Sequence, residues 1–191
     1  MLDKLIEWDR ELFLFLNGKH IDWLDPVMLF LSSYTNWFLA CFIMLVVIYW
    51  KAKDWKKTSS FFFMLSIGVS ALLTNIIKLI IGRPRPIHDK AWEATIHAIE
   101  KYSESFSFFS SHSATTFTMA VFFFLFFRKN RFYGILALIW AALVAYSRIY
   151  VAKHYPFDVI VGIIFGTMIG MLGFWAFERF KKKQDIPESH V

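Results

Sequence analysis

Long stretches without a charged residue are the feature that most restricts how this chain can fold. The runs at 26–50, 58–77, 105–127, 132–147 and 159–177 contain no Asp, Glu, Lys or Arg. A helix needs roughly 20 apolar residues to cross the hydrocarbon core of a bilayer. Four of the runs have or approach this length, and 132–147 reaches it with its flanks. We therefore predict an all-α, integral-membrane helical bundle with about five transmembrane helices.

The alternative is a soluble protein that buries these segments in its core. Of the 191 residues, 57% are hydrophobic and 20% are aromatic. A soluble domain of this length builds its core with far fewer large apolar side chains, and too little polar surface remains to cover five such helices. The single cysteine, Cys41, permits no intrachain disulfide. Composition therefore favours the membrane protein.

The positive charges gather between the runs, in clusters at 51–57, 128–131 and 179–183. Five crossings place all three clusters on one side of the membrane, and the positive-inside rule makes that side cytoplasmic. The net charge of +6 is thus expected to meet anionic lipid headgroups rather than nucleic acid.

The first 25 residues interleave acidic and basic residues with large apolar ones, which is too charged a pattern for a cleavable signal peptide. The apolar residues recur at helical spacing: Leu5, Trp8, Leu12, Phe13 and Leu16. This predicts an amphipathic helix that either lies in the membrane interface or packs on the outside of the bundle. We expect three parts: the interfacial segment 1–25, the membrane domain 26–183 and a disordered cytoplasmic tail 184–191.

Three polar clusters lie where apolar runs meet loops, all on the side opposite the positive clusters. They are Lys78…Arg85-Pro86, Ser110-Ser111-His112 and Ser147-Arg148…His154…Asp158. Together they supply three cations, two histidines, a carboxylate and a helix start that can bind an oxyanion. This set of groups is suited to phosphoryl transfer, in which catalysis is mostly positioning and electrostatics.

His154 and Asp158 are four residues apart, with Pro156 between them. Because proline is tolerated in the first helical turn, we expect a helix to start near Tyr155. Asp158 can then accept the Nδ1 proton of His154 and leave Nε2 free to attack phosphorus. The alternative is a capping carboxylate that only satisfies the helix start.

The start of the run at 105–127 is expected to bind an anion through the Ser110 hydroxyl and free backbone N–H groups. His112 can protonate a leaving oxygen, or it is incidental to a serine N-cap. Arg85 and Arg148 suit phosphate oxygens, and Lys78 completes the set; the alternative for Lys78 taken alone is that it only reaches toward lipid headgroups. Two roles stay open for Arg83: it guides the lipid headgroup, or it only faces water.

The spacings K-x6-R-P, S-x-H and S-R-x5-H-x3-D resemble the three signature motifs of the type 2 phosphatidic acid phosphatase (PAP2) superfamily. The resemblance implies a metal-independent phosphatase without cofactors, in which His154 forms a phosphohistidine, Asp158 orients it and His112 protonates the leaving group. It also implies a phosphate-binding set of Lys78, Arg85, Ser110, Ser111 and Arg148. The second motif usually reads Pro-Ser-Gly-His, and here it reads Phe109-Ser110-Ser111-His112.

The short chain with compact loops is similar to bacterial undecaprenyl-diphosphate phosphatases of this superfamily. We therefore expect a lipid phosphate or diphosphate substrate and a bacterial cytoplasmic membrane location, with the site facing the periplasm or exterior. Phosphatidylglycerophosphate, phosphatidic acid and lipid A phosphatases share these motifs and stay open as alternatives. A transporter of phosphorylated lipids is an alternative of another class, and the oligomeric state is open. A vanadium haloperoxidase is disfavoured because those proteins are large and soluble.

Overall fold

The computed structural model describes residues 2–89, 95–100 and 105–184, and within these ranges the chain is helical without a β-strand. The α-helices are α1 (Leu2–Asn17), α2 (Asp25–Ser32), α3 (Tyr34–Lys51), α4 (Lys56–Ile81), α5 (Ser111–Phe126), α6 (Arg131–Tyr150) and α7 (Pro156–Gln184). Short 3-10 turns are η1 (Asp22–Leu24), η2 (Lys53–Trp55) and η3 (Pro86–His88). The predicted all-α membrane class is confirmed.

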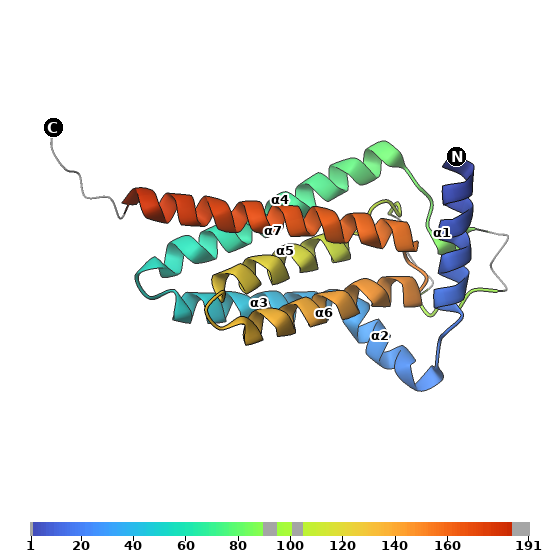
Figure 1. The fold of residues 1–191 in the computed structure, drawn as a ribbon. Coiled ribbons are helices and arrows are strands. Elements are labelled where there is room, and N and C mark those ends of the chain that lie inside the picture. Colours follow the sequence, from blue (N-terminus) through green and yellow to red (C-terminus); the bar gives the residue numbers. More distant parts are fainter. Residues whose placement is uncertain (1, 90–94, 101–104, 185–191) are drawn as a thin grey trace.

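Helices α3 to α7 run along one another as an elongated bundle, with α5 in its interior (Figure 1). Helix α7 packs very closely on α5 because small residues of α7 face it. A Cβ atom added at Gly166 would lie 2.1 Å from the carbonyl oxygen of Ala114. This close approach also brings the backbone N–H of Ser110 to within 3.1 Å of the carbonyl oxygen of Asp158, so the starts of the two helices are tied together.

Four segments are long and apolar enough to cross a membrane: Tyr34–Lys51, Lys53–His88, Arg131–Tyr150 and Pro156–Gln184. Helix α5, with 16 residues, is apolar but shorter. The interior position of α5 explains how it can be short, because its neighbours rather than lipid cover most of its surface. The chain is thus a multi-pass membrane protein.

Two of the charge-free runs do not form single helices over their full length. The run 26–50 is interrupted at Ser33, which is extended (φ −79°, ψ 152°) and caps α3 by accepting a hydrogen bond from the Asn36 backbone N–H at 3.2 Å. The run 105–127 becomes helical only at Ser111, after Ser110 as N-cap. Serine side chains that compete for backbone groups explain both breaks, because such residues favour caps over helix interiors.

Helix α1 lies across one end of the bundle (Figure 1). Phe13 is buried, with its ring 5.6 Å from that of Tyr155, while Leu5, Trp8 and Phe15 on other sides of the helix are exposed. The helix therefore packs on the bundle, as one alternative predicted, and it also leaves large apolar side chains exposed; its place in the membrane interface stays a prediction. The three-part division stays a prediction, and its tail lies outside the described residues from 185 onward.

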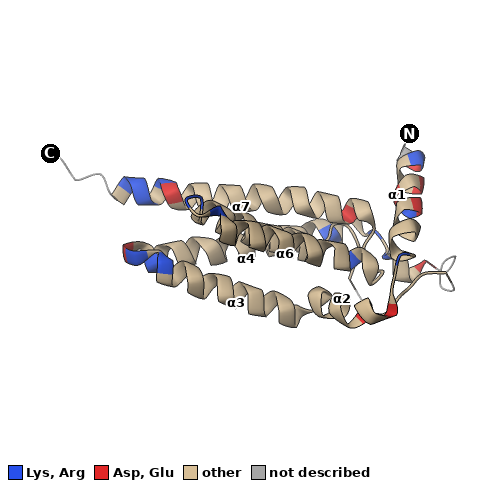
Figure 2. Cartoon of the chain, turned by 60° about the horizontal axis from the view of Figure 1, so that its bottom comes forward, with Lys and Arg blue, Asp and Glu red and all other residues tan. Residues whose placement is uncertain are grey.

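Charged residues gather at the two ends of the bundle and leave its middle uncharged (Figure 2). Lys51, Lys53, Arg128, Lys129 and Lys181 line a common hollow at the end that α1 does not cover. The three motif clusters meet at the other end, beneath α1. The basic clusters and the three motifs therefore lie at opposite ends of the bundle, as the sequence predicted.

Candidate active site

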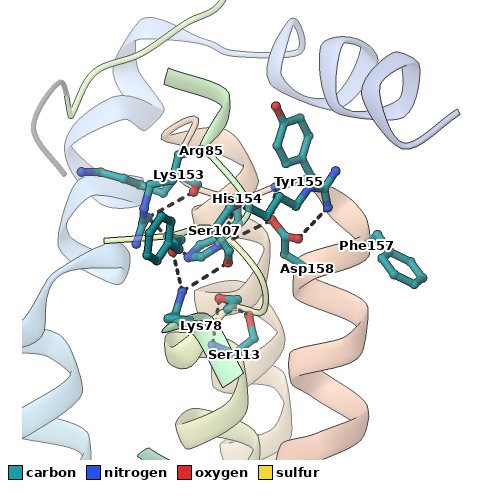
Figure 3. Close-up of polar contacts among 12 residues, drawn as sticks. Lys78, Arg85, Ser107, Ser113, Lys153, His154, Tyr155, Phe157 and Asp158 are labelled. Carbon is teal, nitrogen blue, oxygen red and sulfur yellow. Dashed lines mark hydrogen bonds and ion pairs between the residues drawn. The ribbon is translucent and has the colours of Figure 1, made fainter. Parts of the chain in front are cut away.

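The first turn of α7 fixes Asp158, which is fully buried. Its Oδ2 atom accepts a hydrogen bond from the Tyr155 backbone N–H at 3.0 Å, so Asp158 does cap the helix. The same oxygen accepts a hydrogen bond from the Ser107 hydroxyl, and Oδ1 accepts one from Arg83 at 2.7 Å (Figure 3). Asp158 can therefore cap α7 and also orient a catalytic residue, since its carboxylate binds three partners at once.

His154 is buried and directs its two ring nitrogens toward different partners. Nδ1 lies 3.7 Å from Oδ2 of Asp158 and 3.4 Å from the Ser107 hydroxyl. Nε2 lies 3.5 Å from Nη1 of Arg85. The expected direct hydrogen bond between His154 and Asp158 is therefore not formed, because 3.7 Å is too long. Ser107 instead connects the two side chains.

Burial lowers the pKa of His154 well below its ordinary value of 6.5, and the positive charges of Arg85, Lys78 and Arg148 lower it further. A low pKa keeps the imidazole neutral around pH 7. A neutral ring with an available Nε2 lone pair is the form that a nucleophile requires.

Two buried cations are held by the loop before α5. The ammonium group of Lys78 donates to the carbonyl oxygens of Phe106 and Ser107 at 2.7 and 3.2 Å. Arg85 donates through Nε to the Ser105 carbonyl and through Nη2 to the Ser105 hydroxyl, both at 2.7 Å. Arg85 also donates through Nη1 to the Lys153 carbonyl at 3.1 Å. Each cation still has N–H groups beyond these bonds, since an ammonium has three donors and a guanidinium five.

Arg148 and His112 each carry a buried nitrogen without a partner among the described residues. Arg148 donates through Nη1 to the Ser32 carbonyl at 2.8 Å, whereas its Nε makes no hydrogen bond. Nε2 of His112 is likewise unpartnered, and its ring lies 5.0 Å from that of Tyr34. Buried polar atoms are normally paired, so these two nitrogens are candidates for binding a ligand.

The Ser110 hydroxyl accepts hydrogen bonds from the Ser113 backbone N–H at 3.3 Å and the Ser113 hydroxyl at 2.9 Å. The N-cap alternative therefore describes Ser110 correctly. Ser111 is the first residue of α5 and is partly exposed. Phe109, where the family motif has proline, is buried after a cis peptide bond with Phe108. The backbone N–H groups of this first turn remain candidates for an oxyanion.

Several residues at the site went unrecognised or unresolved in the sequence. Ser107 and Ser105 stand in a Ser/Phe-rich stretch where nothing distinguishes them. Lys153 adjoins His154 and is buried, with its ammonium 3.2 Å from Glu100; burial lowers its pKa. Arg83 does more than face water, since its guanidinium binds Asp158 directly.

Within the described ranges, no three His, Cys, Asp or Glu residues cluster as metal ligands.

Known proteins of similar sequence or fold include membrane phosphatases. The lipid A 4'-phosphatase of Bacteroides thetaiotaomicron is 28% identical over 90% of this chain and 78% of its own length. The undecaprenyl-diphosphatase BcrC of Bacillus subtilis is 28% identical over 86% of this chain and 81% of its own. The crystal structure of a PAP2-type phosphatidylglycerolphosphate phosphatase from Bacillus subtilis has the same fold, with a TM-score of 0.71 and 22% identity over 97% of this chain and 90% of that one.

The match to the family itself covers most of the bundle. Residues 59–182, from the first turns of α4 almost to the end of α7, match the PAP2 superfamily. This range includes all three motif clusters and excludes α1, α2 and α3. The chain therefore belongs to the PAP2 superfamily and is a membrane phosphatase of that family.

Proposed function

We propose that this protein removes the terminal phosphate of a membrane lipid phosphate or diphosphate through a phosphohistidine at His154. The observation that carries the proposal is the placement of the neutral, buried His154 ring. Its Nε2 points to the Arg85 guanidinium, and its Nδ1 points to the pair formed by Ser107 and Asp158. A phosphoryl group in front of Nε2 would meet the positive charges that neutralise its oxygens.

The reaction follows from these positions in two steps. Nε2 of His154 attacks phosphorus while the bond to the leaving oxygen breaks, and His112 gives that oxygen a proton. A water molecule then attacks the phosphohistidine, loses a proton to His112 and releases inorganic phosphate and free His154. Lys78, Arg85 and Arg148, together with the start of α5 at Ser110 and Ser111, bind the phosphoryl oxygens in both steps.

The substrate class we favour is undecaprenyl diphosphate, converted to undecaprenyl phosphate. Similarity to an undecaprenyl-diphosphatase over most of both chains supports this choice. Similarity of the same extent to a lipid A 4'-phosphatase supports a lipid A substrate as the second candidate. Phosphatidylglycerophosphate and phosphatidic acid are the remaining alternatives.

The test is phosphate release by purified protein in detergent from each of these four lipids. We expect the highest kcat/KM with undecaprenyl diphosphate and no release by the His154→Ala variant. Faster hydrolysis of lipid A would reassign the substrate and keep the mechanism. Binding of a lipid phosphate without any phosphate release would favour the transporter alternative instead.

We also propose that the protein lies in a bacterial cytoplasmic membrane with its site facing the periplasm or exterior.

The same proposal includes a reaction that needs no metal ion. The buried cations already supply the positive charge that a metal ion contributes in other phosphatases. Activity should therefore survive EDTA, and orthovanadate should inhibit because it can adopt a geometry close to the transition state. Loss of activity on chelation, restored by Mg²⁺, would refute the metal-free mechanism.

A further inference from the structure

Helix α1 reaches the site through one buried carboxylate, that of Asp9. Its Oδ2 atom accepts a hydrogen bond from Nη2 of Arg83 at 2.7 Å, and its Oδ1 atom accepts one from the Phe157 backbone N–H at 2.8 Å. Phe13, one helical turn further along the same face, packs on Tyr155. The contacts with Phe157 and Tyr155 fall on the segment that carries His154 and Asp158.

The guanidinium of Arg83 is held between two carboxylates. Nη1 binds Oδ1 of Asp158 and Nη2 binds Oδ2 of Asp9, each at 2.7 Å. Its carbon atom Cζ lies 4.0 Å from the centre of the Tyr155 ring. A planar guanidinium with two short ion pairs and a ring beneath it has one orientation, and Asp9 supplies one of these three restraints.

The orientation of Asp158 in turn determines what His154 contacts. Asp158 uses Oδ1 for Arg83 and Oδ2 for Ser107, and Ser107 is the group that lies between Asp158 and Nδ1 of His154. A shift of Arg83 toward Asp158 or away from it would therefore turn the carboxylate and move the Ser107 hydroxyl. Figure 3 shows Ser107, His154 and Asp158 gathered at the start of α7.

We propose that Asp9 is a positioning residue for catalysis: it fixes Arg83 against Asp158 and thereby the Ser107–His154 arrangement. Asp9 lies on α1, outside residues 59–182 that match the family, so the proposal adds a residue from α1 to those of the three motifs. The proposal rests on the phosphatase mechanism proposed above. The competing explanation is that Asp9 merely anchors α1 by capping α7.

The Asp9→Asn variant separates these two explanations. Asparagine keeps an oxygen that can accept from the Phe157 N–H, but it removes the negative charge that holds Arg83. With undecaprenyl diphosphate, or whichever lipid the wild type hydrolyses best, we expect kcat per folded molecule to fall roughly 10-fold with KM nearly unchanged, since misplaced catalytic groups slow the chemical step. The folded fraction comes from thermal unfolding followed by tryptophan fluorescence.

A double-mutant cycle with Arg83→Gln tests the route through Arg83. If Asp9 acts by holding Arg83, adding Asp9→Asn to Arg83→Gln should change kcat less than twofold, because contacting residues in one network are not additive. Glu7→Gln and Glu11→Gln are the matched controls, since both side chains are exposed on the same helix. Each should retain wild-type kcat.

Three outcomes would overturn the proposal. An Asp9→Asn variant with wild-type kcat would show that the charge of Asp9 does not matter for catalysis. A loss of kcat that is fully additive with Arg83→Gln would leave only the anchoring role. A wild-type protein that hydrolyses none of the four lipids would remove the phosphatase mechanism and this proposal with it, whereas the first two results leave that mechanism intact.

Discussion

The two ends of the bundle contain the same kinds of positive side chains in opposite environments. Lys78, Arg85 and Arg148 are only 5–6% exposed, and they donate to backbone carbonyl oxygens and serines. At the other end, Lys53 and Lys129 are exposed to solvent. Buried charges are costly unless they are paired, so a fold keeps them where they perform a function.

The comparison teaches that charge count alone does not locate the site. The exposed end is the more basic one in the sequence, with Lys51, Lys53, Arg128, Lys129 and Lys181 around one hollow of about 410 Å³. The motif end has fewer cations, but they converge on a histidine. We expect substitutions at the two ends to have very different effects on activity.

The largest effect should come from His154, the group on which the buried cations converge. His154→Ala should abolish phosphate release while the protein still inserts and folds, because no other described side chain presents a neutral imidazole nitrogen to Arg85. Asp158→Asn should reduce kcat by roughly 10⁴-fold, as for a carboxylate that orients a catalytic histidine. Phosphate release close to the wild-type rate by purified His154→Ala would refute the mechanism.

Substitution of one cation at each end tests the comparison directly. Arg148→Gln at the site should lower kcat by roughly 10²–10³-fold, the usual cost of losing one group that stabilises charge in the transition state. Lys129→Gln at the other end should leave kcat unchanged, since an exposed charge is screened by water and salt. Equal losses in the two variants, measured as initial rates on one lipid, would mean that the ends do not differ in function.

Much of this arrangement could be predicted because it follows local patterns. Charge-free runs predicted the long helices, and the order of the motifs along antiparallel spans placed His112, His154 and Lys78 at one end. The break at Ser33 was missed because a serine inside an apolar run gives no periodic signal. The contact between Asp9 and Phe157 joins residues 148 positions apart, and no local pattern specifies such a pairing.

A smaller effect is expected from His112, and it should depend on the substrate. His112→Ala removes the proton donor for the leaving oxygen. Phosphatidic acid loses an alkoxide, which needs that proton more than the monophosphate that leaves a prenyl diphosphate. The kcat/KM of the variant should therefore fall more for phosphatidic acid than for undecaprenyl diphosphate, measured with both lipids in one detergent. Identical losses would argue against the acid role and leave the unpartnered Nε2 without an explanation.

The last prediction concerns the side of the membrane to which each end belongs, and its substitutions should not change activity. The basic clusters at the end of α7 and in the α3–α4 and α5–α6 loops favour the cytoplasm for that end. The α1 end, with the site, should then face the periplasm or exterior. In a Cys41→Ser background, Asp22→Cys should react with an impermeant thiol reagent on intact cells or spheroplasts. Both Asp22 and Lys129 are exposed, so access alone separates them.

Lys129→Cys is the matched variant at the opposite end, and it should react only after the membrane is broken. Both proteins should hydrolyse lipid at the wild-type rate, which shows that the labelled molecules are folded. Labelling of Lys129→Cys on intact cells, with Asp22→Cys protected, would place the site in the cytoplasm. A site on that side could not meet a carrier diphosphate released on the outer leaflet. Phospholipid synthesis in the inner leaflet, with a phosphatidylglycerophosphate substrate, would then explain the same residues better.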